Sequence, residues 1–390
     1  MEGWWVWTRG NPWSAAASTV PPALRRLLLG RHRGATFGRR MGGRGFAGGG
    51  LSSPVVFLLG CFRSTLIRVA AVTKYGLWRC EHVEVPVPSA KKNEVLLKLQ
   101  AATVNPLDWK IQKGDLRPLL PRRLPFIPVT DVAGVIVDVG PGVNGLTAGD
   151  QVVAKLNSLN GGGLAEYAVA PANLTVKRPA KVSAAEGAGL PIAAGTALQA
   201  LRSIGAKFDG TGKPLNVLIT AASGGVGLYA VQLAKLANLH VTATCGARNM
   251  DLVKSLGADE VMDYRTPEGA TLQSPSGRKY DGVVHCTVGV SWSSFQLLLS
   301  DAGRVIDITP NLSAILTYVL HRVTFSKKRL VPQLLLSLNK ADLEFLVGLL
   351  EEGKLKTVID SRFPLSDAGK AWQSSIDGHA TGKIVVEMES

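Results

Sequence analysis

The chain has 390 residues, of which 46% are hydrophobic, and a formal net charge of +15. This length and apolar content are enough to bury a large core, most simply in two domains. The four cysteines are scattered without a C-x-x-C pair, so neither a disulfide framework nor a zinc finger is indicated. Residues 1–64 hold nine arginines, no lysine and one acid, and the remainder is only mildly basic. This distribution does not indicate a nucleic-acid partner.

Residues 1–64 lack the pattern of a folded domain. They are rich in Arg, Ser, Ala and Gly, and they contain four of the eight tryptophans without periodicity. This composition is typical of a disordered leader or organelle transit segment, and the alternative is a misassigned gene start. The apolar run at 55–59 is far too short to span a bilayer. We expect the leader to be dispensable for folding and catalysis.

From residue 66 the pattern changes to short apolar runs separated by Gly, Pro and polar residues. These runs predict small strands that form a compact barrel, and helical signals follow at 184–203. The expected strands are 66–72, 81–85, 94–99, 132–139 and 150–154.

A glycine turn stands between a strand and a helix at 216–237. The apolar run 217–219 predicts a strand buried on both faces of a parallel sheet, and residues 228–237 predict a helix. In this order the turn predicts a dinucleotide-binding unit, which holds a pyrophosphate at the helix N-terminus. Ala222 replaces the first glycine of the usual pattern. The candidate binding residues are Ser223, Gly224, Gly225, Val226 and Gly227.

The next strand, expected at 240–245, predicts which cofactor is bound. An acid at its end would bind the ribose hydroxyls of NAD, but none is present. Arg248 stands near that position instead, and Lys254 and Tyr264 follow. This arrangement favours the 2′-phosphate of NADP. The alternative is that Arg248 is a solvated residue at a helix start.

The rest of the chain predicts further strands at 281–286 and 303–308, helices at 250–255 and near 295–299, and mostly helix over 313–352. A closing strand at 381–387 would rejoin the β domain. The expected organisation is a leader (1–64), the first part of a catalytic domain (65–187), an NADP-binding domain (188–322) and the second part of the catalytic domain (323–390).

Over roughly residues 65–390 the chain resembles the medium-chain dehydrogenase/reductase superfamily. The resemblance is carried by the glycine turn and by the motifs at 105–110, 130–134, 163–167, 195–197 and 256–259. It implies an α/β fold, with a GroES-like β-barrel catalytic domain and a Rossmann domain built on a doubly wound parallel sheet.

Members of that superfamily that use zinc carry a cysteine where this chain has Asn105, and Gly-His-Glu where it has Val129-Thr130-Asp131. They also carry a four-cysteine lobe that this sequence lacks. The chain therefore resembles the zinc-free quinone oxidoreductase branch. Within it, residues 155–166, 244–248 and 375–383 are most similar to plant chloroplast-envelope quinone oxidoreductase homologues, whose relatives include alkenal/oxoene reductases.

This resemblance implies an NADPH-dependent, metal-free enzyme that transfers hydride to the C=C of enones, oxoenes or γ-ketols, or to quinones. Asn105 and Lys110 are the expected catalytic residues, in a wall that includes Trp109, Thr130 and Val288. The alternatives are an Asx-turn for Asn105, a surface ion pair for Lys110 and a helix cap for Thr196. His285 could be taken for a general acid, but its place in the strand favours the alternative, a core or ribose-facing position. The further cofactor-binding candidates are Thr196, Arg248, Lys254, Tyr264, Cys286 and Lys383.

The resemblance also implies a plastid location, at the inner envelope and peripheral to it. The basic leader and the run Lys327–Arg329 could contact anionic lipid, although the run could equally be a solvated helix end. A small-molecule enone or quinone substrate and a homodimer are the other expected partners. A catalytically weak NADPH-binding protein is the alternative function.

Overall fold

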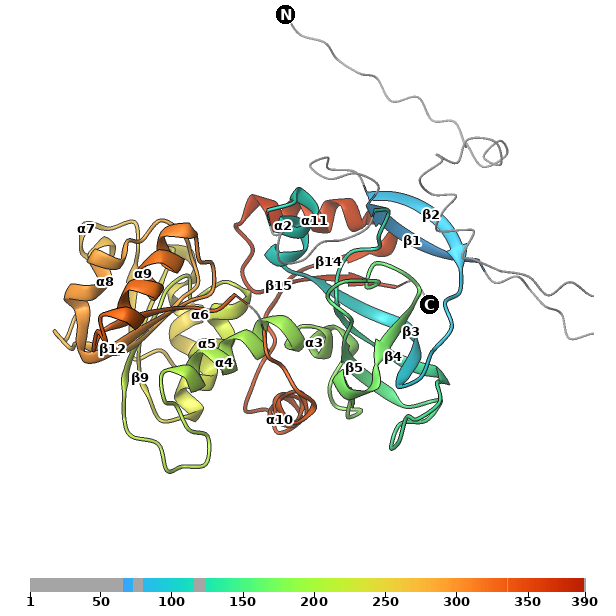
Figure 1. Cartoon of the computed structure of the whole chain (residues 1–390), viewed down its shortest axis with the longest axis horizontal. Helices are drawn as coiled ribbons and strands as arrows, with labels where there is room; N and C mark the ends of the chain where they lie inside the picture. The colour runs from blue at the N-terminus through green and yellow to red at the C-terminus, as the bar shows by residue number, and fades with distance from the viewer. Residues whose placement is uncertain (1–65, 73–79, 116–123, 335, 389–390) are drawn as a thin grey trace, which may run out of the picture.

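The computed structural model describes residues 66–72, 80–115, 124–334 and 336–388. They form two domains that lie side by side along the long axis of the molecule (Figure 1). The leader lies outside the described residues. The expected combination of a GroES-like domain and a parallel Rossmann-type sheet is confirmed.

The catalytic domain is built on a seven-stranded sheet in the order β14-β15-β3-β4-β5-β7, with β6 paired to β3. A separate hairpin-like pair, β1 and β2, is antiparallel. The side chains that face inward pack around Trp372, which is fully buried. The strands are β1 (Leu66–Val72), β2 (Cys80–Pro86), β3 (Glu94–Val104), β4 (Asp131–Val139), β5 (Gln151–Lys155), β6 (Tyr167–Pro171), β7 (Thr175–Lys177), β14 (Ile359–Pro364) and β15 (Lys383–Glu387).

The cofactor domain holds a six-stranded sheet in the order β10-β9-β8-β11-β12-β13, and every pair in it is parallel. By strand number this is the order 3-2-1-4-5-6 of the doubly wound dinucleotide-binding fold, so the chain reverses direction across the sheet between β8 and β11. The strands are β8 (Asn216–Ile219), β9 (His240–Cys245), β10 (Glu260–Asp263), β11 (Tyr280–His285), β12 (Leu299–Asp307) and β13 (Arg329–Pro332).

Helices cover both faces of this sheet. Val217 and Ile219 of β8 face the core formed with α4 and α5, whereas Leu218 faces the core formed with α8 and α9. Burial on both faces explains why this strand is a continuous apolar run. The helices of the chain are α2 (Pro106–Lys113), α3 (Ala184–Ala188), α4 (Gly195–Ser203), α5 (Gly225–Leu236), α6 (Met250–Ser255), α7 (Pro267–Ala270), α8 (Trp292–Leu298), α9 (Leu312–Val323), α10 (Lys340–Glu351) and α11 (Ala368–Asp377).

Five strands were not predicted from the sequence: β6, β7, β10, β13 and β14. The segment 313–352, expected to be mostly helical, contains β13 between α9 and α10. Because β13 pairs with β12, the sheet of the cofactor domain continues past residue 322 to Pro332. The strands β10 and β14 are short or polar, and β14 alternates between half-buried and exposed residues.

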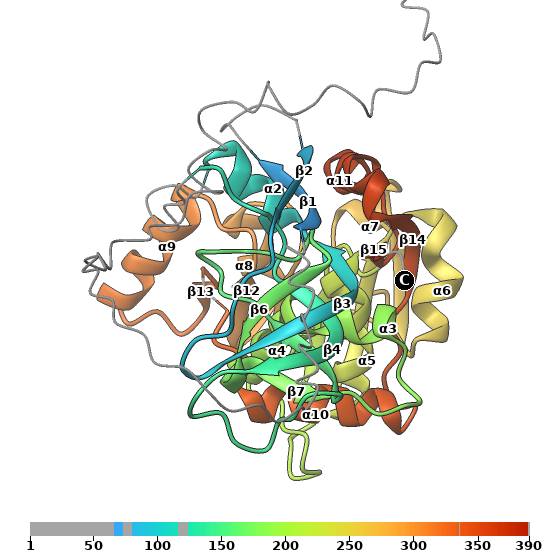
Figure 2. The same cartoon turned by 90° about the vertical axis from the view of Figure 1, so that its right-hand side faces the viewer.

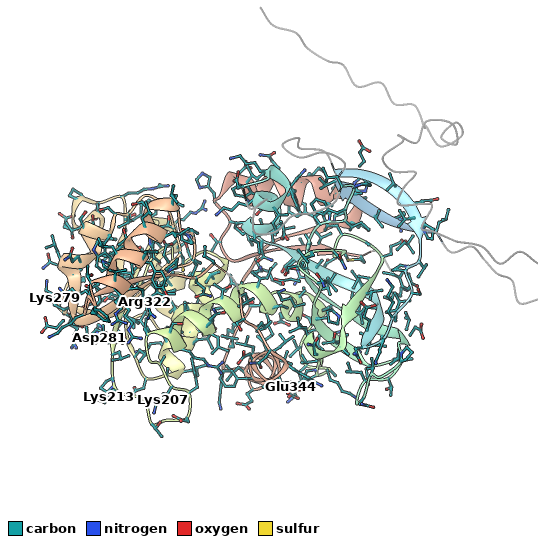
Figure 3. The ribbon with its side chains drawn as sticks, viewed as in Figure 1. Lys207, Lys213, Lys279, Asp281, Arg322 and Glu344 are labelled. Carbon is teal, nitrogen blue, oxygen red and sulfur yellow. The ribbon has the colours of Figure 1, made fainter. Side chains whose placement is uncertain are left out.

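Figure 3 shows Lys207, Lys213, Lys279 and Asp281 on the outer surface of the cofactor domain.

The two domains meet where the glycine turn approaches the start of β15. The Gly382 N–H donates to the Ser223 carbonyl at 3.0 Å, and Gly224 and Gly382 form an isolated parallel bridge. Gly382 has a φ of +96°, and a Cβ atom there would lie 2.3 Å from the Val358 carbonyl oxygen. Only glycine fits this junction, so the closing strand can reach the cofactor domain.

We expect Gly382→Ala to lower the free energy of unfolding by about 2–4 kcal/mol, because it combines a left-handed backbone with a backbone clash. Gly378→Ala is the matched control, since Gly378 has a φ of +71° but its nearest contact would be 3.7 Å away. That control should cost only about 1 kcal/mol. Denaturant unfolding measures both values, and equal losses would contradict the proposed clash.

Candidate active site

The glycine turn forms an open cradle at the N-terminus of α5. Gly224 is the N-cap residue, and no side chain caps the helix. A Cβ at Gly227 would lie 2.4 Å from the Ala221 carbonyl oxygen, so only glycine allows the helix to pack this closely on the turn. A cradle of backbone N–H groups at the positive end of a helix fits a pyrophosphate.

Asn105 lies at the centre of a buried hydrogen-bond network. Its Nδ2 donates to Asp131 Oδ2 at 2.9 Å and to the Thr103 carbonyl at 3.2 Å, and its Oδ1 accepts from Lys383 Nζ at 2.6 Å. Asn105 is also the N-cap residue of α2, in a capping box with Asp108, so its side chain serves both the network and the start of the helix. Asp108 caps the entry to α2 by accepting from the Asn105 backbone N–H at 2.8 Å.

Lys383 connects this network to the cofactor cradle. It is the first residue of β15, it is 3% exposed, and its Cδ would lie 3.4 Å from a Cβ built on Gly225. The sequence-predicted residues Asn105, Ser223, Gly225 and Lys383 thus come together, although they belong to different domains.

Two further groups of the expected wall have unsatisfied polar atoms. The Trp109 indole Nε1 and the Thr130 hydroxyl are buried, and neither has a hydrogen-bond partner among the described residues. A buried donor without a partner costs free energy, so an acceptor supplied by a ligand would stabilise both. Lys110 is half-buried, and its Nζ lies 5.8 Å from the Trp109 ring centroid.

The expected 2′-phosphate residues lie around the end of β9. Arg248 is exposed on the turn after β9 and donates to the His379 carbonyl, and Asn249 Oδ1 accepts from the Thr381 hydroxyl at 3.2 Å. A cavity of about 470 Å³ opens beside these four residues. Tyr264 is exposed near Gly246.

Lys254 is exposed on α6, and none of the described contacts joins it to Arg248 or Tyr264.

His285 is the last residue of β11, which lies next to β8 in the sheet, and Cys286 follows it. The Cys286 N–H donates to the Thr220 hydroxyl at 2.9 Å, and burial raises the pKa of its thiol to about 12. His285 is buried, contacts Thr220 through Nδ1 at 3.0 Å, and has a pKa lowered by burial. These contacts fit the core position given as an alternative for His285, and a thiol that stays protonated at neutral pH fits no nucleophilic role for Cys286.

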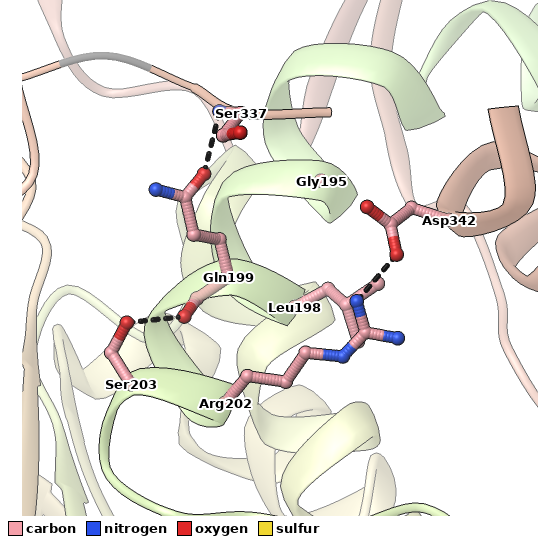
Figure 4. A pocket seen from close by; sticks show the side chains of 7 residues that line it. All are labelled: Gly195, Leu198, Gln199, Arg202, Ser203, Ser337 and Asp342. Carbon is pink, nitrogen blue, oxygen red and sulfur yellow. Dashed lines mark hydrogen bonds and ion pairs between the residues drawn. The ribbon is translucent and has the colours of Figure 1, made fainter. Parts of the chain in front are cut away.

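Thr196 is the second residue of α4, and its carbonyl accepts from Gln333 Nε2 at 3.3 Å. A separate cavity of about 240 Å³ lies against the same helix (Figure 4). It contains the ion pair between Arg202 and Asp342, and Gln199 bonds to the Ser337 backbone at its rim. None of the expected catalytic or cofactor-binding residues lines this cavity.

Among the residues that the structure describes, no group of three or more His, Cys, Asp or Glu side chains is arranged to hold a metal ion. Across the same residues, no helix is both long and apolar enough to cross a bilayer.

Comparison with known proteins agrees with this geometry. Residues 91–180 match the alcohol dehydrogenase GroES-like domain, and residues 256–386 match the family described as zinc-binding dehydrogenase. The solved quinone oxidoreductase from Coxiella burnetii superposes with a TM-score of 0.74 at 29% identity, covering 83% of this chain and 100% of that one. Fold and site together define an oxidoreductase of the class that uses a nicotinamide cofactor.

The chain belongs to the medium-chain dehydrogenase/reductase superfamily. It is 65% identical to the chloroplast envelope quinone oxidoreductase homologue of Arabidopsis thaliana, over 79% of this chain and 93% of that protein. It is also 33% identical to the chloroplastic NADPH-dependent alkenal/one oxidoreductase of Arabidopsis thaliana, over 77% and 74% of the two chains.

Sequence patterns did not identify Asp131, on whose hydrogen bonds the arrangement of the site depends. The Asp131 carboxylate holds Asn105 and also accepts from the Ile192 backbone N–H at 3.1 Å. The signal that could have identified it is an acid directly before the apolar run 132–137 of β4, because a carboxylate buried there needs partners.

Proposed function

We propose that this chain is an NADPH-dependent, zinc-independent reductase that transfers hydride to the C=C of α,β-unsaturated carbonyls, or to quinones. The observation that carries the proposal is the pair of buried donors, Trp109 Nε1 and the Thr130 hydroxyl, that lack a partner among the described residues. Each is the sequence neighbour of a carboxylate that bonds to Asn105, since Trp109 follows Asp108 and Thr130 precedes Asp131. Donors of this kind stabilise negative charge that develops on a carbonyl oxygen.

Different residues of the chain bind the cofactor, orient the groups around it and bind the substrate. The cofactor supplies the hydride. The α5 N-terminus and Lys383 bind its phosphates, and Asn105 orients the groups around it. Since both Nδ2 hydrogens of Asn105 are already donated to Asp131 and Thr103, we assign the oxygen of the substrate to Thr130, Trp109 and the Lys110 ammonium.

Zinc independence is supported by what occupies the two positions where zinc-dependent members carry ligands. The Asn105 side chain is hydrogen-bonded to Asp131, Thr103 and Lys383, and position 130 carries a hydroxyl rather than an imidazole. Neither side chain is a usual zinc ligand. No step of the proposed reaction passes through a metal.

The preference for NADPH is supported by Arg248 and by the absence of an acid at the end of β9. A relative that is 33% identical also carries NADPH in its name. The plastid location is supported by the chloroplastic names of three relatives that are 62–65% identical. Attachment to the inner envelope stays a prediction.

We expect wild-type kcat/KM to be much higher with NADPH than with NADH, and Arg248→Ala to reduce that ratio by about tenfold to a hundredfold, the worth of one charge-assisted hydrogen bond. Arg304→Ala is the matched control, because Arg304 is also an exposed arginine that donates to a carbonyl, that of Ser203 at 3.1 Å. Equal use of both cofactors by the wild type would refute the preference.

The reaction itself is tested with NADPH that carries deuterium at the transferred position. Reduction of an enone should place the label on the β-carbon and leave the carbonyl intact. Label on the carbinol carbon of an allylic alcohol would show that C=O is reduced instead.

Thr130→Val should lower kcat roughly tenfold or more, because it removes a donor to the substrate oxygen. Thr175→Val, which removes a buried hydroxyl bonded to the Pro171 carbonyl, should leave kcat unchanged.

The partner-facing surface that we propose is the outer face of α9. Its exposed apolar residues recur at helical spacing, and Leu316 is 62% exposed. The helix is fixed in place, because buried His321 accepts from the Leu330 N–H at 3.2 Å. In Figure 2, α9 lies at the outer edge of the molecule. The exposed apolar residues are Leu312, Leu316, Val319, Leu320, Val323 and, just beyond the helix, Phe325.

We assign this face to a second copy of the chain. Within α9 only Arg322 and the buried His321 can carry charge, so the face can pack against its own copy without like charges at its centre. Two residues of the basic run Lys327–Arg329 form hydrogen bonds within the chain. Lys328 Nζ donates to the Gln296 and Leu299 carbonyls, and Arg329 Nε donates to the Ser326 carbonyl.

We expect sedimentation to show a wild-type dimer that Leu316→Lys converts to a monomer. Val137→Lys is the control, since Val137 is an exposed apolar residue of the catalytic domain. A monomeric wild type would refute the dimer, and binding of anionic vesicles that Leu316→Lys abolishes would assign the face to a membrane instead.

A further inference from the structure

Asp131 is a buried carboxylate for which the proposed reaction has no direct use. It begins β4 and is fully buried. Its Oδ2 accepts from the Asn105 side chain and from the Ile192 backbone N–H, whereas its Oδ1 has no hydrogen-bond partner among the described residues. An ionised group in such a place is costly unless it has a function or a counter-ion.

The hydrogen bonds of Asn105 give Asp131 an influence on Lys383. A side-chain amide has a donor end and an acceptor end, and a carboxylate can only accept from the donor end. Because Asp131 accepts from Nδ2, the Oδ1 end of Asn105 is turned toward Lys383 Nζ, 2.6 Å away. The orientation of one amide therefore links Asp131 in the catalytic domain to a lysine beside the glycine turn.

The charges of Asp131 and Lys383 each stabilise the ionised form of the other residue. Burial lowers the pKa of Lys383, and the carboxylates of Asp131 and Asp108 oppose that effect. Burial also raises the pKa of Asp131, and the charges of Lys383 and Lys155 oppose it. Each partner thus favours the charged form of the other, and removal of the Asp131 charge favours a neutral Lys383.

The same carboxylate also positions the cofactor-side helix. Ile192 belongs to the π-helical turn Leu190–Ala194, which runs directly into α4 and its second residue, Thr196. Single π-turns within helices occur often at functional sites. One carboxylate thus fixes the approach to α4 and the amide that contacts Lys383.

We propose that Asp131 is a positioning residue for the cofactor: it orients the Asn105 amide and, through it, holds the Lys383 ammonium toward the glycine turn, where the phosphates of a nicotinamide dinucleotide bind. The inference rests on the proposed cofactor site, but not on the identity of the substrate. It assigns Asp131 no contact with the substrate or the cofactor.

The test is a double-mutant cycle read out as the Kd of NADPH, measured by fluorescence without turnover. Asp131→Asn keeps the shape of the side chain and removes its charge, and Lys383→Met removes the ammonium. We expect Asp131→Asn to raise Kd about tenfold in the wild-type background. In the Lys383→Met background it should have no further effect, because the asparagine oxygen can still accept from the Ile192 N–H and the lost charge acts on the cofactor through Lys383.

Asp342→Asn is the matched control. It neutralises another buried acid that pairs with an arginine, Arg202, away from the cradle, and it should leave Kd unchanged. The double variant Asp131→Asn/Lys383→Met keeps the test usable if Asp131→Asn does not fold, because it removes both buried charges together. Its Kd should then equal that of Lys383→Met.

An unchanged Kd in Asp131→Asn, or two effects that add in the double variant, would overturn the proposal. A wrong substrate class would leave all of these results standing, since no substrate is present. If Lys383→Met itself binds NADPH as the wild type does, Lys383 is not part of the cofactor site and the proposal fails with it.

Discussion

The hydrogen bond from Lys383 Nζ to Asn105 Oδ1 is the contact on which the arrangement of this site depends. It joins residues of β15 and of the α2 entry, and it lies where the catalytic domain meets the glycine turn. The Gly382 N–H bonds to Ser223 one residue earlier, so backbone and side chain hold the two domains at the same point. The cradle for the cofactor and the wall for the substrate are therefore set relative to each other by one short segment.

Burial of the charged groups in this network costs free energy of folding, and that cost explains which residues form it. Lys383 and Asp131 are both buried, and each would be strongly disfavoured alone. Asn105 lies between them and gives each of them one hydrogen bond through a neutral amide. The arrangement stabilises a single geometry rather than contributing much to overall stability. In contrast, the part of the chain that the structure describes offers no hydrogen-bond partner to the Thr130 hydroxyl or to the Trp109 indole.

Local sequence pattern predicted the parts of the fold that local forces determine. The run Val217–Ile219, the glycine turn and the helix after it follow directly from burial on both faces of β8 and from the packing of Gly227. The strand β14 was missed because three consecutive polar residues, 360–362, interrupt its apolar pattern at a sheet edge where no residue is fully buried. Asp131 was missed because its partners Asn105 and Ile192 lie 26 and 61 residues away, and Lys383 lies 278 residues from Asn105. No periodicity encodes contacts at those separations.

We propose that the Thr130 hydroxyl, the Trp109 indole and the Lys110 ammonium, beside the hydrogen-bond network of Asn105, stabilise charge on the substrate oxygen as a metal does in zinc-dependent members of this superfamily. The direct measurement is the metal content and enone reductase activity of the same purified protein before and after dialysis against a strong chelator. Our account predicts that kcat/KM with NADPH is unchanged and does not vary with zinc content. Stoichiometric zinc whose removal abolishes activity, and whose return restores it, would contradict the account.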